Sequence, residues 1–276
     1  MPLIWMIKYM VIVVSLFLLF VFYIFCLKGR NGKKLLNDLS KYNFAHRGLH
    51  NETCAENSIS AFLAAKEKGY GVELDVHILS DNTLAVFHDK TLDRVTGKSG
   101  KIGDLKMEDL KNYNLLNSAD TIPTFEEVLE IFDHKVPLIV ELKNDEGRCN
   151  DLCEKVCKVL DNYKGIYCIE SFDPRCLMWL RKNRPDIIRG QLVQNFLKSP
   201  SGMGKVLDLV LTSLILNIAT RPDFIATKFA DRKDFSIIIS TKFWNTKKVF
   251  WTIDDMDDQQ KTKKENAISI FEKIIP

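Results

Sequence analysis

The sequence has few glycines and prolines, and it contains no internal repeat, low-complexity tract or paired cysteine framework. Its 276 residues include 13 glycines and 8 prolines, whereas 46% of the residues are hydrophobic and 27% are charged. These proportions are close to those of an ordinary globular protein. They exclude a collagenous, a mainly disordered and a disulfide-dense chain.

A strong excess of charge of one sign is also missing, since the formal net charge is only +3. Residues 1–42 carry six basic residues against Asp38 alone, so residues 43–276 have two more acidic than basic residues. The mildly basic isoelectric point therefore belongs to the N-terminal segment. It gives no support to a nucleic-acid-binding domain, and we expect no nucleic-acid partner.

Charge is absent altogether from Tyr9 to Leu27, a run of 19 residues in which only Ser15 and Cys26 interrupt the apolar pattern. As a helix this run would be about 28 Å long, which is enough to cross the hydrocarbon core of a bilayer. It predicts one N-terminal transmembrane helix.

We therefore divide the chain into a transmembrane anchor at residues 1–30, a basic linker at residues 31–42 and a C-terminal domain at residues 43–276. Four cations follow the apolar run closely: Lys28, Arg30, Lys33 and Lys34. By the positive-inside rule, the C-terminal domain of this single-pass membrane protein should face the cytoplasm. The alternative is a cleaved signal peptide. The apolar run is longer than a typical signal core, however, and no small-x-small cleavage site follows it.

The seven cysteines are an odd number: Cys26, Cys54, Cys149, Cys153, Cys157, Cys168 and Cys176. Cys149, Cys153 and Cys157 recur every four residues and would form one stripe on a helix. Zinc sites usually combine a close cysteine pair with a distant second pair, and no such second pair is visible. We interpret the cysteines as buried thiols in a reducing compartment.

Beyond the anchor, short runs rich in β-branched and aromatic residues alternate with helical patterns. The predicted strands are Phe44–His46, Val72–Ile78, Leu84–His88, Leu138–Leu142, Ile166–Glu170, Ile187–Leu192 and Val249–Ile253. The predicted helices are Ile59–Lys68, Phe125–Phe132, Asn150–Asn162, Arg175–Asn183 and Val206–Ala219. This α/β alternation indicates a parallel sheet with crossover helices, either open and doubly wound or closed into a barrel. Residues 195–247 carry the weakest pattern.

Three acidic residues interrupt the strand patterns. Glu73 and Asp75 lie on one face of their strand, and Glu141 near the end of another apolar strand is followed on the same face by Lys143. Carboxylates that converge inside a sheet must be paired with cations, and a divalent ion is an economical partner. Oxygen ligands favour Mg²⁺ or Ca²⁺, with Mn²⁺ as a further candidate, over zinc.

Two histidines lie at predicted strand ends. His46 ends the first strand and His88 ends the third, at the edge where α/β enzymes assemble their sites. Such a pair can act as general base and general acid near neutral pH. Arg47 offers planar donors suited to a phosphate. The remaining histidines, His50, His77 and His134, have no comparable setting, although His77 shares the face of Asp75.

In their order, these residues resemble the glycerophosphodiester phosphodiesterase family, a group that includes phosphatidylinositol-phosphodiesterase-like TIM barrels. The segments that carry the resemblance are His46-Arg47-Gly48, Glu56-Asn57-Ser58, Glu73-Leu74-Asp75-Val76, His88-Asp89, Glu141-Leu142-Lys143, Ser171-Phe172-Asp173 and Trp251-Thr252-Ile253. The resemblance extends from about Asn43 to Ile253.

The resemblance implies an α/β fold of the TIM (β/α)8 type, here preceded by the transmembrane helix. It implies hydrolysis of glycerophosphodiesters to glycerol 3-phosphate and an alcohol. The roles it implies are His46 and His88 as the acid/base pair, Glu73, Asp75 and Glu141 as metal ligands, and Arg47 and Lys143 as phosphate-binding residues. Trp251 either lines the substrate pocket or packs as an ordinary strand tryptophan.

The chain departs from the family pattern at three places. Ser58 replaces the usual Thr, Asp254 stands where Asn is common, and the usual terminal Thr-Asp-x-Pro segment is replaced by the residues from Ile270 to Pro276. These departures affect the last turn of the expected barrel and the pocket beside Trp251.

Two other functions compete with this hypothesis. A lysophospholipase D-type or cyclising phospholipase would act on membrane lysolipids, because the anchor holds the domain beside lipid. A membrane-tethered binding module would keep the barrel without turnover, but the intact histidine pair and the three carboxylates argue against it. The sequence leaves open which histidine is the base and whether water or a glycerol hydroxyl attacks.

Overall fold

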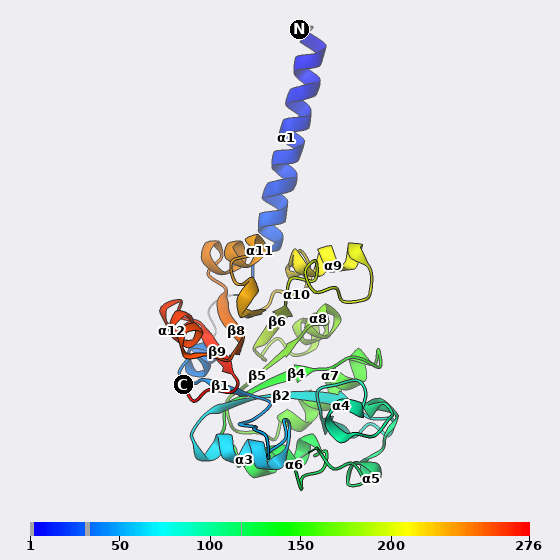
Figure 1. Ribbon diagram of the computed structural model, residues 1–276. Coiled ribbons are helices and arrows are strands. Elements are labelled where there is room, and N and C mark those ends of the chain that lie inside the picture. The colour runs from blue at the N-terminus through cyan, green and yellow to red at the C-terminus, as the bar shows by residue number, and fades with distance from the viewer. Residues whose placement is uncertain (1–2, 31–33, 117) are drawn as a thin grey trace.

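The strands form one sheet whose order closes on itself (Figure 1). The computed structural model describes residues 3–30, 34–116 and 118–276. Within these ranges the strands are β1 (Phe44–His46), β2 (Gly71–Ile78), β3 (Leu84–Val86), β4 (Leu138–Leu142), β5 (Tyr167–Ser171), β6 (Arg189–Val193), β7 (Phe224–Lys228), β8 (Lys247–Ile253) and β9 (Ile268–Phe271). Because β1 pairs in parallel with both β2 and β9, eight parallel strands make a closed TIM-type barrel. The sequence pattern allowed either an open doubly wound sheet or a closed barrel, and the protein forms the closed barrel.

Helices surround the ring of strands (Figure 1). They are α1 (Leu3–Cys26), α2 (Lys34–Leu39), α3 (Ile59–Glu67), α4 (Asp93–Thr96), α5 (Met107–Leu110), α6 (Phe125–Phe132), α7 (Cys149–Leu160), α8 (Pro174–Asn183), α9 (Lys205–Thr212), α10 (Asn217–Thr220), α11 (Phe235–Ile238) and α12 (Met256–Lys264). Short 3₁₀ turns at Ile102–Asp104 and Phe229–Asp231 and a π-helix at Ile239–Phe243 complete the connections. Sequence signals account for several helix starts. Thr124 and Glu127 form a capping box at α6, and Pro174 occupies the first turn of α8.

The two faces of each strand have different partners. On β2, Val72, Leu74 and Val76 join an apolar cluster with residues of the outer helices, including Phe125 of α6. A second cluster joins strands from opposite sides of the barrel and fills its interior: Phe44, Ile139, Phe224, Val249 and Ile270 are among its members. Burial of each such side chain contributes about 1.5–3 kcal/mol. The inward face of β2 is thereby left to Glu73 and Asp75.

Several predicted elements differ from those observed. Strands β7 and β9 were not predicted, because runs of four or five residues among charged neighbours carry too little periodicity. The predicted helix Val206–Ala219 is divided into α9 and α10, because the backbone of Leu214 adopts a left-handed conformation (φ 55°) that interrupts the helix. Leu214 is held in this conformation within a buried cluster that includes Leu27.

The strand predicted to end at His88 is also shorter than expected, and it lies outside the barrel. Strand β3 ends at Val86 and runs antiparallel to β2, so His88 does not end a barrel strand. The chain instead returns along β2, where the Phe87 N–H donates to the Asp75 carbonyl at 3.0 Å. This return brings His88 to the level of Asp75.

Helix α1 projects away from the barrel (Figure 1). It has 24 residues, its most apolar window has a mean hydropathy of 2.7, and only 6% of that window is buried. A core helix of a soluble domain would be mostly buried. The helix is thus long and apolar enough to cross a membrane.

The predicted boundary after residue 30 does not separate α1 cleanly from the barrel. The Trp244 indole N–H donates to the Ile24 carbonyl at 2.7 Å, and the Ser240 hydroxyl donates to the Leu27 carbonyl at 3.0 Å. Arg30 makes an ion pair with buried Asp223. In the predicted linker, residues 31–33 lie outside the described ranges, including Lys33 of the basic cluster. Further along, the chain forms α2, which packs Leu39 into the barrel interior cluster.

Candidate active site

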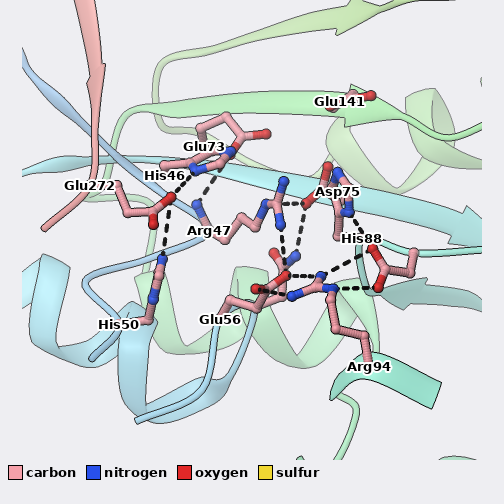
Figure 2. Close-up of polar contacts among 12 residues, drawn as sticks. His46, Arg47, His50, Glu56, Glu73, Asp75, His88, Arg94, Glu141 and Glu272 are labelled. Carbon is pink, nitrogen blue, oxygen red and sulfur yellow. Dashed lines mark hydrogen bonds and ion pairs between the residues drawn. The ribbon is translucent and has the colours of Figure 1, made fainter. Parts of the chain in front are cut away.

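The predicted site residues converge at the carboxyl ends of the barrel strands (Figure 2). His46 ends β1 and is in register with Glu73 of β2, and Asp75 is in register with Glu141 of β4. In a parallel barrel these strand ends share one rim. Residues as far apart in the sequence as His46 and Trp251 therefore surround one small space.

Glu73, Asp75 and Glu141 form a group of three buried carboxylates. One oxygen from each lies within 4.8 Å of the others. A divalent cation bound by carboxylates has metal–oxygen distances of about 2.0–2.6 Å, so a single ion would be within reach of all three. The geometry is therefore that of a possible acidic metal site.

A fourth carboxylate, Glu170 of β5, was not selected from the sequence. It is in register with Glu141 and almost completely buried, and its Oε2 accepts no hydrogen bond from the described residues. The signal was present, because Glu170 ends the predicted apolar strand Ile166–Glu170 just as Glu141 interrupts its own strand. A buried oxygen without a donor fits a site that takes up a cation.

The four carboxylates differ in their tendency to ionise. Burial and the neighbouring carboxylates raise the pKa of Glu73 and of Glu170 well above the ordinary value. Burial also raises the pKa of Glu141 to about 7, although Lys143 opposes the change. At Asp75 burial is outweighed, chiefly by Lys143, and the pKa is held well below the usual range. The Lys143 Nζ lies 3.1 Å from Asp75 Oδ1 and 2.7 Å from Glu141 Oε1.

Each of the two predicted catalytic histidines is bonded to a carboxylate through Nδ1. His46 Nδ1 donates to Glu272 at 2.8 Å, and His88 Nδ1 donates to Asp89 at 2.6 Å. A carboxylate can only accept, so Nδ1 carries the proton and Nε2 of the neutral ring keeps a free lone pair. Burial lowers the pKa of both rings, although Glu272 opposes the change at His46 and Asp75 opposes it at His88. The neutral form is thereby favoured.

Glu272 follows the last barrel strand, in the segment where the chain departs from the family pattern. The bond from His46 lowers the pKa of Glu272 to about 2. The Nε2 of His50 lies 3.9 Å from the same carboxylate (Figure 2). His50 lies at no strand end, as expected, but the loop after β1 folds back toward the chain end and brings it to Glu272. The sequence carried no signal for this contact.

His77, which shares the face of Asp75, contacts the backbone of His88. Its Nε2 donates to the His88 backbone carbonyl at 3.2 Å. It is buried, and burial lowers its pKa to about 4. His134 lies elsewhere, beside Tyr163.

Arginine–carboxylate pairs connect the two sides of the site. Arg47 donates to Glu56 at 2.7 Å, and Arg94 bonds both Glu56 and Asp89. At Glu56 burial is outweighed by bonds from Arg94 and Arg47, and its pKa falls to about 2. The chain of contacts from Arg47 to His88 is visible in Figure 2. Neither Glu56 nor Arg94 was singled out as a site residue, since Glu56 belongs to a loop and Arg94 to the short helix α4, and neither segment carries a strand pattern.

The motif residues around Arg47 have conformational reasons for their identity. Arg47 and Gly48 both have positive φ, at 56° and 82°. A Cβ on Gly48 would lie 2.8 Å from the Ala61 Cβ, so only glycine fits there. The turn directs the Arg47 N–H to Glu73 Oε2 at 3.1 Å. The Asn57 amide then donates to Asp75 at 2.8 Å.

Ser58, where the family usually has Thr, caps α3 by accepting from the Ala61 N–H at 3.1 Å. A hydroxyl is all that this cap requires. The substitution is therefore conservative in its local structural role.

Trp251 lines the small central cavity of about 50 Å³, together with His46 and His88. Its ring contacts Phe172 edge to face, with centroids 5.8 Å apart. Its indole N–H has no hydrogen-bond partner among the described residues. Trp251 therefore both packs against its neighbours and borders the site.

A larger cavity of about 820 Å³ opens beside the catalytic rim. Polar and charged side chains line part of it: His88, Asp89, Lys90, Glu141, Lys143, Asn144, Asp145, Ser171, Asp173 and Arg175. Apolar side chains form much of the remaining wall: Phe172, Pro174, Met178, Phe196, Met203, Leu207, Leu211 and Leu216. The site thus continues into a space suited to apolar groups.

Comparison with known proteins agrees with this geometry. A model of the glycerophosphoryl diester phosphodiesterase family matches residues 46–271. The glycerophosphodiester phosphodiesterase of Caldanaerobacter subterraneus is 33% identical over 166 residues, which are 56% of this chain and 68% of that protein. Human glycerophosphodiester phosphodiesterase 1 is 27% identical over 241 residues, or 78% of this chain and 72% of that protein.

A solved structure has the same fold. It is a phosphodiesterase from Oleispira antarctica in complex with the product sn-glycerol-3-phosphate, which is 24% identical to this chain with a TM-score of 0.68. The match covers 84% of this chain and 92% of that one. The family match across the whole barrel and the convergence of its motifs at one rim lead to a single conclusion: the chain belongs to the glycerophosphoryl diester phosphodiesterase family of hydrolases.

Proposed function

We propose that the protein is a metal-dependent hydrolase that cleaves glycerophosphodiesters to glycerol 3-phosphate and an alcohol. The observation that carries this proposal is an excess of buried carboxylates over buried cations at the barrel rim. Lys143 and Arg47 face four carboxylates: Glu73, Asp75, Glu141 and Glu170. The solved Oleispira antarctica relative holds glycerol 3-phosphate, the product expected from this reaction.

Glu73, Asp75 and Glu141 would hold the metal ion. Their oxygen donors suit Mg²⁺ or Ca²⁺, with Mn²⁺ as a further candidate. When bound, such an ion supplies Lewis-acid stabilisation of charge on the phosphoryl oxygens. Arg47 and Lys143 add fixed positive charge beside the same group, and their ion pairs with Asp75 hold them in position before substrate binds.

His46 and His88 would act as the acid/base pair through Nε2. In its neutral form, a histidine with Nδ1–H bonded to a carboxylate can accept a proton at Nε2 from water or from a neighbouring glycerol hydroxyl. The other histidine, in its protonated form, donates from Nε2 to the departing alkoxide. Glu272 and Asp89 orient the rings and stabilise the positive charge that develops.

Helix α1 would anchor the protein in a membrane as a single pass, with the barrel in the cytoplasm. Its low burial separates it from core helices, and contacts from Trp244 and Ser240 tie its end to the barrel, which favours retention over cleavage. The cations that follow it agree with cytoplasmic orientation.

A second candidate activity, on single-chain lysophospholipids, is favoured by the apolar cavity. The cavity joins the catalytic rim to α9, and the Tyr23 hydroxyl of α1 bonds the Ser213 carbonyl directly after α9. Apolar side chains are exposed around the same end of α1: Leu197, Met203, Val206, Leu209, Phe235 and Phe243. Such a surface fits a membrane interface, from which an acyl chain would enter the cavity beside His88.

The metal assignment predicts that EDTA abolishes hydrolysis of glycerophosphocholine and that added Mg²⁺, Ca²⁺ or Mn²⁺ restores it. Glu141→Gln removes the negative charge of one proposed metal ligand. Mutation of residues that only hydrogen-bond to metal ligands typically costs about 10–100-fold in metal affinity or activity, so metal affinity and turnover should fall at least about tenfold. The metal-induced rise in melting temperature should shrink accordingly. Exposed Glu108→Gln is the control and should behave like the parent. Full activity of Glu141→Gln in EDTA would refute the assignment.

The acid/base assignment predicts that His46→Ala and His88→Ala each lose about 10²–10⁴-fold in turnover while remaining folded. In a nitrophenyl phosphodiester the leaving group, nitrophenolate, needs little protonation as it departs. This substrate should therefore restore turnover in the variant that lacks the general acid and not in the variant that lacks the general base. Because burial lowers the pKa of both rings, the acid limb of the parent kcat/KM profile should fall below pH 6.5, the ordinary histidine pKa. Near-parental turnover in both folded variants would exclude the assignment.

The proposed orientation predicts that protease added to intact cells leaves the barrel undigested, whereas protease added to permeabilised cells digests it. An epitope after Pro276 reports on the barrel by immunoblotting. A periplasmic or extracellular marker protein, digested in both conditions, serves as the control. Digestion of the barrel in intact cells would show that the orientation is the reverse.

If the protein also cleaves lysophospholipids, polar substitutions in the apolar cavity should reduce that activity and leave glycerophosphodiester cleavage unchanged. Leu207 and Leu211 lie one turn apart on the cavity face of α9, whereas Leu209 lies on the opposite face. Leu207→Gln and Leu211→Gln should reduce lysophosphatidylcholine cleavage about tenfold, because a polar group opposes burial of the acyl chain. Glycerophosphocholine cleavage should not change, and Leu209→Gln is the matched control. Equal loss on both substrates, or no release of lysophosphatidate or its cyclic form, would exclude this activity.

A further inference from the structure

Three cysteine thiols meet between helices α7 and α8, outside the catalytic rim. Cys149 and Cys153 lie one turn apart on α7, and Cys176 lies on the neighbouring helix α8. Their sulfur atoms are all within 4.8 Å of one another. The stripe expected from the sequence included Cys157 in place of Cys176. Folding thus supplies the distant cysteine that the sequence pattern did not reveal.

Two of these thiols lie at the starts of their helices. Cys149 is the first residue of α7, and Cys176 lies in the first turn of α8 behind Pro174. The N-terminal end of a helix carries partial positive charge and stabilises an anion. The two helix ends therefore favour negative charge on the sulfur atoms that would bind a cation.

Two other buried cysteines, Cys157 and Cys168, lie apart from this group. Among the described residues, neither belongs to a cluster of metal-ligating side chains. Cys157 lies on the same buried stripe of α7, one turn beyond Cys153. It is thus an internal control, a buried thiol outside the group of three.

We propose that Cys149, Cys153 and Cys176 bind one thiophilic divalent cation of the zinc class. Zinc–sulfur bonds of about 2.3 Å in tetrahedral geometry place two ligand sulfurs about 3.8 Å apart, within the observed spacing. Three sulfur ligands leave a fourth position for water. Binding forms three metal–sulfur bonds and releases to solvent every proton still held by the three thiols.

The cysteine site is chemically distinct from the carboxylate site. Thiolates select soft cations, whereas the rim carboxylates select hard ones, so the two sites would take different ions. Cys149 is 9% exposed and the other two thiols are fully buried, so the ion would enter past Cys149.

An ion held there would join the starts of α7 and α8. The loops directly before these helices carry Asn144 and Asp173, which bond each other at 2.7 Å and line the large cavity. The cation would therefore act as a structural clamp on one wall of that cavity and would not take part in the reaction.

Cadmium titration of the full-length protein in detergent tests the proposal. The protein is reduced with a phosphine and kept in excess Mg²⁺, so that the carboxylate site does not compete for Cd²⁺. Thiolate-to-Cd²⁺ charge-transfer absorption should saturate at one ion per chain, with simultaneous proton release. Cys149→Ser and Cys176→Ser should each weaken binding by at least about tenfold. Cys157→Ser, on the same stripe, should bind like the parent.

A second measurement needs no substitution and so does not depend on the variants folding. Zn²⁺ loading of the parent protein should slow alkylation of Cys149 by a maleimide, measured by mass spectrometry of its peptides, and should leave Cys54 unchanged. Equal Cd²⁺ absorption in the parent and in Cys176→Ser, or equal alkylation of Cys149 with and without Zn²⁺, would overturn the proposal. Neither readout depends on phosphodiester hydrolysis.

Discussion

Buried negative charge at the barrel rim is the constraint on which the rest of the site depends. Glu73, Asp75, Glu141 and Glu170 belong to three adjacent parallel strands, and all four are buried. An ion removed from water loses several kcal/mol of solvation, so each carboxylate needs a cation, a donor or a proton. The cations on the rim satisfy Asp75 best and leave the other three with raised pKa values. A divalent cation, as proposed above, would satisfy the remainder.

Each of the two site histidines, His46 and His88, is held by a carboxylate. Each ring donates through Nδ1 to a carboxylate that itself belongs to a larger set of contacts, Glu272 at the end of the last strand and Asp89 beside Arg94. Figure 2 shows that Glu56 links Arg47 to Arg94 and so connects the first loop to the His88 side. Low-dielectric surroundings strengthen such connected bonds. The orientation of the His46 ring therefore depends on a residue 226 positions away, whereas the His88 ring is held by its neighbour in the chain.

Different chemistry occupies different layers around the same rim. The carboxylate group lies inside the barrel, and the three cysteine thiols lie outside it between α7 and α8. The large cavity is lined by residues of the loops that precede these two helices. The C-terminal end of α1 contacts two elements near this cavity. Tyr23 donates to the Ser213 carbonyl directly after α9, and its ring contacts Phe235 of α11. The end of α1 therefore packs against the barrel domain close to the cavity.

The sequence by itself determined those features that depend on local spacing. Alternation along β2 indicated that Glu73 and Asp75 share a face, the capping residues indicated the starts of α6 and α8, and the uncharged run indicated α1. Only the tertiary structure decided which distant segments meet. It closes the barrel and returns His88 along an antiparallel strand. It also brings Glu272 to His46 and Cys176 to Cys149. The physical reason is that a residue pattern records which way a side chain points relative to its neighbours in the chain. It does not record the partner, and the pairing of Phe44 with Ile270 that closes the barrel joins segments more than two hundred residues apart.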